Sequence, residues 1–526
     1  MKRRSFLAAA ATTLAAPAVR AAGSAKVLKF VPQADIALLD PHFAPALVTR
    51  NHAYLLFDTL YGVDNQAAPH PQMAAGHVIE DDGKTWKITL RDGLRFHDGE
   101  PVLARDAAAS LKRWAKRDVY ALSVFQGVDE VSALSDKVLQ FRLKRPFRLL
   151  ADLLAKPPPF APAIMPERMA LTEPGQAVKE LIGSGPFRFV MSERVPGSRA
   201  VYEKFAGYVP RTDGPPVGTC GPKIANFERI EWHTIPDPAT AAAALQAGEV
   251  DWWEQPTGDL LPLLRKNKDI TVSVIDTLGY HGVLRFNHLH PPFNNPAIRR
   301  ALLGAFSQAD MMQAVAGEDR SMWKTDTGFF NPASPFANDA GMGALNSPRD
   351  LARVKRELAS AGYNGEKFAF LVPTDLPAIN AMSEVAGDIF RKLGMNMDYI
   401  TADWATVAQR LNSPETPDKG GWSLNANYAP GFSPMSPAAH GFLRGLGRNS
   451  LFGWPTMPKV EELRSAWIET TDPAEQQRLC REIQLAAFQD VPYIPLGSFF
   501  FAAAFRSDLT GILTGGIPLF TNVKRT

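Results

Sequence analysis

Cysteine is almost absent from this chain, whose 526 residues contain only Cys220 and Cys480. This scarcity excludes a disulfide-dense scaffold and the metal centres that several cysteines build, such as iron–sulfur clusters and cysteine-rich zinc sites. The two thiols lie far apart in the sequence. They could pair in an oxidising compartment, which would close a long loop, or stay as two separate buried thiols, and the sequence leaves both interpretations open.

Long apolar runs are also missing after the N-terminus. No later stretch reaches 18 consecutive apolar residues, the length at which a membrane-spanning helix would be predicted. The composition is otherwise that of a globular protein, with 45% hydrophobic and 21% charged residues, which excludes the disordered, collagen-like and coiled-coil classes. The length of 526 residues predicts about three to four folding units of roughly 150 residues each.

Residues 1–22 have the pattern of a cleaved export signal. Lys2, Arg3 and Arg4 start an apolar, alanine-rich run, and small residues at 21–23 suit a signal peptidase. The twin arginine before Ser5-Phe6-Leu7 is typical of the Tat pathway, with a Sec signal as the alternative. We therefore expect a periplasmic mature protein.

Positive charge is concentrated in this predicted signal. Removing its Lys2, Arg3, Arg4 and Arg20 lowers the formal net charge from +3 to 3 − 4 = −1. A nearly neutral chain with scattered charges is not expected to bind nucleic acid or anionic membranes in a general way.

Motifs that carry catalysis are missing as well. The sequence contains no G-x-x-x-x-G-K-[ST] phosphate loop, no H-E-x-x-H and no G-x-S-x-G. His288 and His290 could form a metal pair, but no nearby cysteine or carboxylate completes a site, so we interpret both as loop imidazoles. We predict a protein that is not an enzyme and that needs no cofactor and no metal.

Strand-like and helical runs alternate along the whole chain. Asp-Gly pairs at 82–83, 92–93 and 98–99 predict hairpins between about 80 and 180, and regular helix–strand alternation from about 340 to 490 predicts a βαβ unit. The nearly continuous apolar run from 493 to 505 predicts one strand that is buried on both faces. Other predicted strands include 27–31, 86–90, 229–235, 282–286 and 367–372, and other predicted helices include 105–114, 239–247, 378–393 and 473–488.

Five short motifs follow one another from end to end of the chain. They are Leu39-Asp40-Pro41, the segment 82–101 with DGKTW and LRDGLRFHDGEP, GSGPF at 183–187, ALQAGEVD at 244–251, and the segment 286–301 from Phe286-Asn287 to Arg300-Ala301. Together and in this order they resemble the family 5 extracellular solute-binding proteins of bacterial ABC importers, the dipeptide-, oligopeptide- and nickel-binding type.

The resemblance implies a two-lobed α/β fold, the type II periplasmic-binding-protein fold of the large peptide-binding class. Residues 24–278 and 490–526 would form the first lobe, with an extra α+β subdomain at about 70–180, and residues 279–489 would form the second lobe. The hinge crossings would lie near 278–282 and 492–500.

The resemblance also implies a function. The chain would be the periplasmic substrate-binding component of an ABC transporter that captures a short peptide or peptide-like small solute by hinge closure. As a monomer it would deliver this solute to a permease and ATPase complex at the inner membrane. The alternatives are a receptor for a metal chelate, an opine or an oligosaccharide, and, less favoured, an exported enzyme.

The resemblance places a ligand segment in the second lobe. Peptide binders of this type carry a Trp there and, shortly after it, an Asp that pairs with the peptide's amino group. Here the segment contains Trp422, Asn425, Asn427 and Tyr428. Asn427 offers hydrogen bonds but no charge, which argues against a ligand with a free α-amino group. Trp422 and Tyr428 could stack on a ligand or hold a cation, with core packing as the alternative for Trp422.

The remaining predicted ligand residues come from the first lobe, the hinge and a loop. Gln33, Ala34 and Asp35 follow the first strand and would face the cleft, where Asp35 could supply the missing anion or simply cap a turn. Tyr280 lies at the expected hinge. Arg444 could pair with a ligand carboxylate, or be an ordinary solvated loop arginine.

Overall fold

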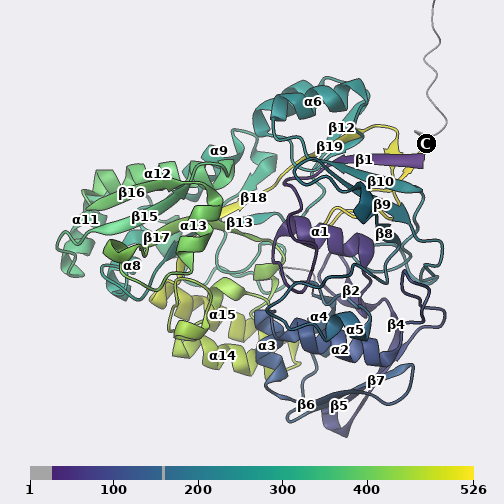
Figure 1. Ribbon diagram of the computed structural model, residues 1–526. Coiled ribbons are helices and arrows are strands. Elements are labelled where there is room, and N and C mark those ends of the chain that lie inside the picture. Colours follow the sequence, from purple (N-terminus) through teal and green to yellow (C-terminus); the bar gives the residue numbers. More distant parts are fainter. Residues whose placement is uncertain (1–25, 157–159) are drawn as a thin grey trace, which may run out of the picture.

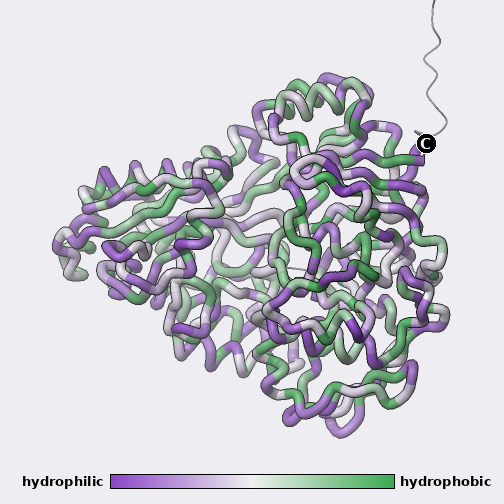
Figure 2. The backbone as a smooth tube through the Cα atoms, in the orientation of Figure 1, coloured by the Kyte–Doolittle hydropathy of each residue, from purple (hydrophilic) through white to green (hydrophobic). Residues whose placement is uncertain are grey.

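The computed structural model describes residues 26–156 and 160–526 (Figure 1). The predicted signal peptide, residues 1–22, lies outside the described residues. Two large sheets dominate the structure, one in each lobe. In Figure 2 the hydrophobic residues follow the strands inside both lobes, while hydrophilic residues gather on the outer helices and loops. Across the described ranges, no helix is long and apolar enough to cross a membrane.

The first lobe is built on a seven-stranded sheet. Strand β1 lies near its centre, parallel to β10 and β11, whereas β19 runs antiparallel to β11 and β12. In order across the sheet the strands are β12 (Ile270–Ser273), β19 (Ala503–Arg506), β11 (Trp252–Trp253), β1 (Val27–Val31), β10 (Arg229–His233), β9 (Arg199–Lys204) and β8 (Phe187–Phe189).

The two faces of this sheet are covered by different elements. Phe30 and Trp252 point to the side of helix α1 (Leu47–Leu56), where the ring of Phe520 packs 4.9 Å from Phe30. The neighbours Val31 and Trp253 point to the other side, toward helix α6 (Pro238–Ala247). This alternation follows from the two-residue period of a strand, and it places α1 on one defined side of the sheet.

The second lobe is built on a six-stranded sheet. Strand β13 runs antiparallel to β17 and β18, and β15 runs parallel to β16 and β17. The order is β14 (Trp323–Lys324), β18 (Tyr493–Phe499), β13 (Tyr280–Phe286), β17 (Leu424–Pro430), β15 (Phe368–Pro373) and β16 (Met397–Ala402). The helices of this lobe are α8 (Pro296–Leu303), α9 (Gln308–Ala316), α10 (Gly343–Asn346), α11 (Leu351–Ser360), α12 (Pro377–Leu393), α13 (Trp404–Leu411), α14 (Pro458–Glu469) and α15 (Pro473–Asp490).

Several predicted helices start and stop at recognisable cap residues. The Asp237 carboxylate accepts a 2.7 Å hydrogen bond from the Thr240 N–H at the start of α6, and Gly248 ends that helix with a φ of 73°. Helix α12 begins with Pro377 and ends before Gly394 in the same left-handed conformation. Proline fits the first turn of a helix and glycine fits the residue after its end, so these boundaries were predictable.

The extra subdomain contains a four-stranded antiparallel sheet. Its order is β4 (Ala74–Glu80), β5 (Thr85–Leu90), β7 (Val138–Leu143) and β6 (Val128–Ala133). A turn at Asp81–Gly83 joins β4 to β5, where the Asp-Gly pair predicted a hairpin. The sheet is accompanied by α2 (Ala104–Ala115), α3 (Val119–Phe125), α4 (Leu150–Ala155) and α5 (Glu167–Ala170), and β2 (Tyr61–Val63) pairs with β3 (Pro69–Pro71) nearby.

The chain crosses between the two large sheets twice. It leaves the first sheet after β12 and enters the second at β13, so the first crossing segment is 274–279. It returns between β18 and β19, through the second crossing segment, 500–502. The prediction of one strand over 493–505 is therefore wrong, because the run forms two strands in different sheets. The chain also returns to the first lobe after Phe499, whereas the predicted boundary lay at residue 490.

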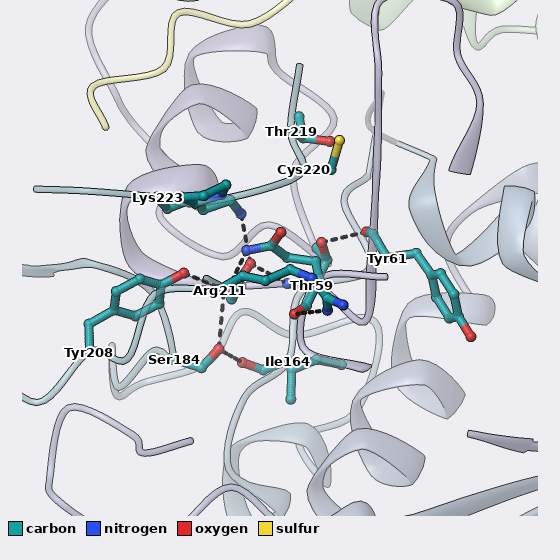
Figure 3. Close-up of polar contacts among 12 residues, drawn as sticks. Thr59, Tyr61, Ile164, Ser184, Tyr208, Arg211, Thr219, Cys220 and Lys223 are labelled. Carbon is teal, nitrogen blue, oxygen red and sulfur yellow. Dashed lines mark hydrogen bonds and ion pairs between the residues drawn. The ribbon is translucent and has the colours of Figure 1, made fainter. Parts of the chain in front are cut away.

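A buried polar cluster lies directly after helix α1 (Figure 3). The Asp58 carboxylate is 2.7 Å from the Lys223 ammonium and accepts a 2.8 Å hydrogen bond from the Tyr208 hydroxyl. The Asp58 N–H donates to the Ser184 hydroxyl, which donates in turn to the Ile164 carbonyl. Buried charges need such partners, and this set ties the end of α1 to four distant segments.

The two cysteines do not form a disulfide. Cys220 and Cys480 are both free and buried. Cys220 lies in the first lobe, where its thiol donates to the Val217 carbonyl, and Cys480 lies on α15 in the second lobe. The alternative of two separate buried thiols is the one the structure contains.

Candidate ligand-binding site

Two adjoining hollows lie where the chain crosses between the sheets. The first has about 550 Å³ of empty space that opens to solvent, and the second about 390 Å³. Their shared walls are Arg50, Asp276 and the segment 515–517. The first hollow is also bounded by Pro430 to Phe432 of the second lobe, and the second by Trp252, Glu254, Tyr280 and Phe501. Both lobes and both crossing segments therefore contribute to one candidate site.

Helix α1 places Arg50 at this site. Nearly every residue of the helix is buried, including the consecutive polar residues Arg50, Asn51 and His52. Arg50 is only 4% exposed, and its Nε and Nη2 atoms both donate to the Asn51 Oδ1, at 3.1 and 2.7 Å. In the described part of the chain, no carboxylate oxygen lies within 4.0 Å of its guanidinium.

Glu254 follows β11 and faces the second hollow. Its two oxygens accept hydrogen bonds from the Gln33 N–H at 2.8 Å and from the Asn51 amide at 2.7 Å. Burial raises the pKa of the Glu254 carboxyl, although the Gln33 N–H and the Arg50 charge act in the opposite direction. The carboxylate therefore links the end of β1 to helix α1 beside the hollow.

Asp276 lies in the first crossing segment and borders both hollows. Its Oδ1 accepts hydrogen bonds from the N–H groups of Leu278 and Gly279, at 3.0 and 3.1 Å. Burial raises the pKa of the Asp276 carboxyl, and the nearby charge of Arg50 opposes this. The site thus holds one cation and two acids that influence one another across the hollows.

Aromatic rings form the wall next to these charges. The ring of Tyr280 lies 5.0 Å from that of Phe501, 5.3 Å from Tyr428 and 5.8 Å from Phe499, measured between centroids. Burial raises the pKa of Tyr428 to about 12, so it stays neutral at physiological pH. Such a wall can pack against an apolar part of a ligand or lie beside a cation.

The arrangement suits binding. The charged groups around the hollows are held by their own neighbours, and they could pair with opposite charges on a bound solute. In residues 26–156 and 160–526, no group of three or more His, Cys, Asp or Glu side chains could hold a metal ion.

Of the predicted ligand residues, Tyr280 lines the second hollow, and the ring of Tyr428 packs against the ring of Tyr280. Trp422 is fully buried in a cluster with Trp454 and donates from its indole to the Leu411 carbonyl at 3.0 Å. Asn425 is also fully buried and donates to the Leu371 carbonyl, and Asn427 contacts Asn425. None of these last three residues borders the two hollows.

None of the predicted first-lobe residues lines the hollows. Gln33 is linked to the site through the hydrogen bond from its N–H to Glu254. Ala34 is exposed, and the Asp35 carboxylate accepts hydrogen bonds from the Gly197 N–H and the Thr234 hydroxyl, so its bonds are to its own lobe. Arg444 is buried, 3.5 Å from the Glu461 carboxylate of α14, away from both hollows.

Sequence reasoning missed Arg50, Glu254, Asp276 and Phe501. One signal was available for the first of them: Thr49-Arg50-Asn51-His52 interrupts an apolar helix, and a charged residue inside a buried helix usually has a function or a partner. Asp276 and Phe501 gave no such signal. They line the hollows because they lie in the two crossing segments, which are remote from each other in the sequence.

The chain matches the family described as "Bacterial extracellular solute-binding proteins, family 5 Middle" over residues 68–443. A protein from Sinorhizobium fredii, described as "Probable peptide ABC transporter periplasmic-binding protein y4tO", is 33% identical over 499 residues, which cover 93% of this chain and 92% of that protein.

Two solved structures share the fold. AgaA from Agrobacterium tumefaciens, in complex with agropinic acid, has a TM-score of 0.79 at 19% identity and covers 95% of this chain and 99% of its own. A dipeptide-binding protein from a Pseudoalteromonas species, in complex with Met-Leu, has a TM-score of 0.78 at 20% identity and covers 95% of this chain and 100% of its own. The predicted periplasmic-binding-protein fold is confirmed. The chain belongs to the family 5 bacterial extracellular solute-binding proteins, and it is a binding protein and not an enzyme.

Proposed function

We propose that this chain is the periplasmic substrate-binding component of an ABC importer, and that it captures a short peptide or peptide-like small solute between its lobes. The observation that carries the proposal is the position of the hollows, whose walls come from both lobes and both crossing segments. The Sinorhizobium relative, described as a probable peptide ABC transporter periplasmic-binding protein, supports the ligand class.

Hinge closure supplies the mechanism. Pro430 to Phe432 belong to the second lobe and Arg50 to the first, so a ligand can contact both sets only when the lobes are together. A ligand that gains contacts in one conformation shifts the population toward it. Closure also excludes water, which strengthens the polar contacts inside. A permease and ATPase complex would then recognise the closed, loaded form.

The test is a thermal-shift panel on the mature protein with dipeptides, tripeptides, opines, oligosaccharides and nickel chelates. A ligand that binds only the folded protein stabilises it, by about 2.7 kcal/mol at 100 times its Kd. We expect a saturable rise in melting temperature with peptides or peptide-like compounds, and a smaller radius of gyration in small-angle scattering with the same compounds.

Other outcomes would contradict the proposal in distinct ways. Stabilisation by oligosaccharides or nickel chelates with no response to peptides would keep the transport role but replace the ligand class. Turnover of a compound without any saturable stabilisation would contradict the binding role itself.

A further inference from the structure

We infer that the site selects an amphoteric solute, with Arg50 receiving its carboxylate and Asp276 its cationic nitrogen. The inference rests on the proposed function and adds the charge pattern of the ligand and the two residues that read it. Neither residue belongs to the second-lobe segment where the sequence placed the ligand contacts. Three features support the inference: unused hydrogen-bond donors on Arg50, charges that are kept apart, and the aromatic wall of the second hollow.

Arg50 keeps donors that its neighbours do not use. A guanidinium has five N–H donors, and Arg50 directs Nε and Nη2 to a single oxygen, the Asn51 Oδ1. Among the described residues, Nη1 has no hydrogen-bond partner, and the side chain borders both hollows.

Arg113, an equally buried arginine of the same lobe, shows the usual arrangement. It bonds to both oxygens of Asp40 and to the carbonyls of Thr172 and Gln176. Arg50 is thus left with donors that suit a carboxylate, the group that a guanidinium binds best.

The opposite charges at the site do not neutralise one another by contact. Backbone N–H groups hold Asp276, and Gln33 and Asn51 hold Glu254, so neither carboxylate lies within 4.0 Å of Arg50. The hollows therefore present a separated positive and negative end. A dipolar ligand can satisfy both ends at once, whereas a neutral sugar can satisfy neither charge.

Asp276 is better placed than Glu254 to receive the cation. Both oxygens of Glu254 already accept hydrogen bonds, whereas among the described residues the hydrogen bonds to Asp276 use Oδ1 alone. Gly516 lines both hollows next to this carboxylate, and a methyl group there would lie 3.5 Å from Oδ2 and 3.6 Å from Oδ1. A glycine at this position therefore leaves space beside the carboxylate.

The remaining wall sets the polarity between the two ends. Tyr280, Phe501 and Trp252 offer aromatic surface beside Asp276. This surface suits a solute with an apolar part between its two charges.

The experiment compares chemically matched probes on the wild-type protein. The first set is Met-Leu, its methyl ester and its N-acetyl derivative, and the second is octopine with its methyl ester; a neutral oligosaccharide is the uncharged probe. We expect at least one free amphoteric compound to bind, and its ester and N-acetyl forms to bind about tenfold or more weakly, because each loses one charge-assisted contact.

Variants then assign the two ends. Arg50→Gln should weaken the binding of an amphoteric probe about tenfold or more and remove the preference for that probe over its methyl ester. Arg50→Lys should give an affinity between those of the wild type and Arg50→Gln. Asp276→Asn should remove the preference over the N-acetyl form while keeping the preference over the ester. Arg105→Gln, on the exposed surface of α2, where the arginine pairs with Glu167 of the same lobe, is the matched control and should bind as the wild type does.

Each alternative result has a definite meaning. If esters or N-acetyl forms bind as tightly as the free compounds, or only the oligosaccharide binds, the amphoteric assignment is overturned while the transport role stands. If no probe of any class stabilises the protein, the proposed function fails together with it. The probe comparison on the wild-type chain decides the amphoteric preference even if Arg50→Gln does not fold, and Arg50→Lys and Asp276→Asn still test the two residues: unchanged preferences in both variants would overturn their assignment.

Discussion

At the scale of single residues, buried charges in this molecule are held in two ways. The side chains of Asp58 and Lys223 are 0% and 4% exposed and lie 2.7 Å apart, so each neutralises the other. Arg50 is almost equally buried but is hydrogen-bonded to an amide. The first arrangement stabilises the fold, and the second leaves a charge available at the hollows.

Replacing Asp58 tests the structural role of the buried pair. Asp58→Asn leaves the Lys223 ammonium buried without its carboxylate, and we expect a loss of about 3–5 kcal/mol in the free energy of unfolding, measured by denaturant titration. Glu462→Gln, in the exposed pair with Lys459, should change stability by less than about 0.5 kcal/mol. Equal effects of the two substitutions would contradict this account.

The same pair predicts part of the acid sensitivity. Burial opposes ionisation of Asp58, but the Lys223 charge together with the hydrogen bonds from Lys223 and Tyr208 outweighs it and holds the pKa of this carboxyl below its usual range. A lowered pKa contributes stability above the unfolded value near pH 4, and the contribution is lost as the pH falls through the folded value. Asp58→Asn should therefore flatten the acid limb of the stability profile.

Asp152 on α4 predicts the opposite pH dependence. Burial raises its pKa to about 6, whereas the same carboxyl has a pKa of about 4 in the unfolded chain. Between these two values the folded state still holds a proton that the unfolded state has released, and ionising the carboxyl in the folded state costs stability. The resulting penalty grows between about pH 4 and pH 6 and is complete above that range. Asp152→Asn should raise the melting temperature at pH 8 and leave it unchanged at pH 4, and a gain that did not depend on pH would rule out this cause.

At the scale of elements, the family motifs fix the position of helix α1. Gly183 and Gly185 of the GSGPF motif pass directly over its C-terminal end, where the Gly185 N–H donates to the Leu56 carbonyl at 2.7 Å. His97, from the HDGEP motif, accepts from the Gly183 N–H and lies 3.1 Å from the Gly185 carbonyl. Two motifs that identify the family therefore hold the helix that carries Arg50.

A methyl group at Gly185 tests this clamp. It would lie 2.7 Å from the Leu56 carbonyl carbon and 2.8 Å from the Phe57 nitrogen, both backbone atoms that cannot move aside easily. Gly185→Ala should lower stability by about 1–3 kcal/mol and weaken ligand binding, as followed by thermal shift. Gly175→Ala, where nothing lies within 4 Å, is the matched control and should be nearly neutral.

The sequence predicted most elements and few of the site residues. Strand 27–31 and helix 239–247 match β1 and α6 closely because alternation and cap residues mark them locally. The prediction of one strand over 493–505 failed because the run forms two strands that are buried in different sheets, and burial gives both strands the same apolar pattern. Trp422 and Asn425 were predicted from the family's ligand segment, but burial among their own neighbours is a tertiary property that no local pattern shows.

At the scale of the whole molecule, the two crossing segments touch one another. Gly279 of the first has a φ of 64°, and a methyl group there would lie 2.6 Å from the Phe499 carbonyl oxygen and 2.8 Å from the Phe500 ring. The extra subdomain also meets the second lobe, because their buried side chains join in one hydrophobic cluster and Arg145 lies 4.0 Å from Glu469. The described arrangement is one in which the lobes are together.

A side chain at Gly279 should disturb that arrangement. Gly279→Ala forces the crossing segments apart and also places alanine in a left-handed conformation, so we expect a larger radius of gyration with ligand present and a smaller thermal shift. Gly258→Ala, which meets nothing within 4 Å, should leave both unchanged. An unaltered radius of gyration in Gly279→Ala would show that closure does not depend on this contact.

The place of β19 in the first sheet has a consequence for how the protein is made. This strand, residues 503–506, lies between β12 and β11, and β12 is joined to the rest of the sheet through it. Residues 503–506 must therefore be synthesised before the sheet that begins at residue 27 can be completed. Until then β11 and β12 each lack the strand that separates them, and an unpaired strand edge is a place where other chains can associate.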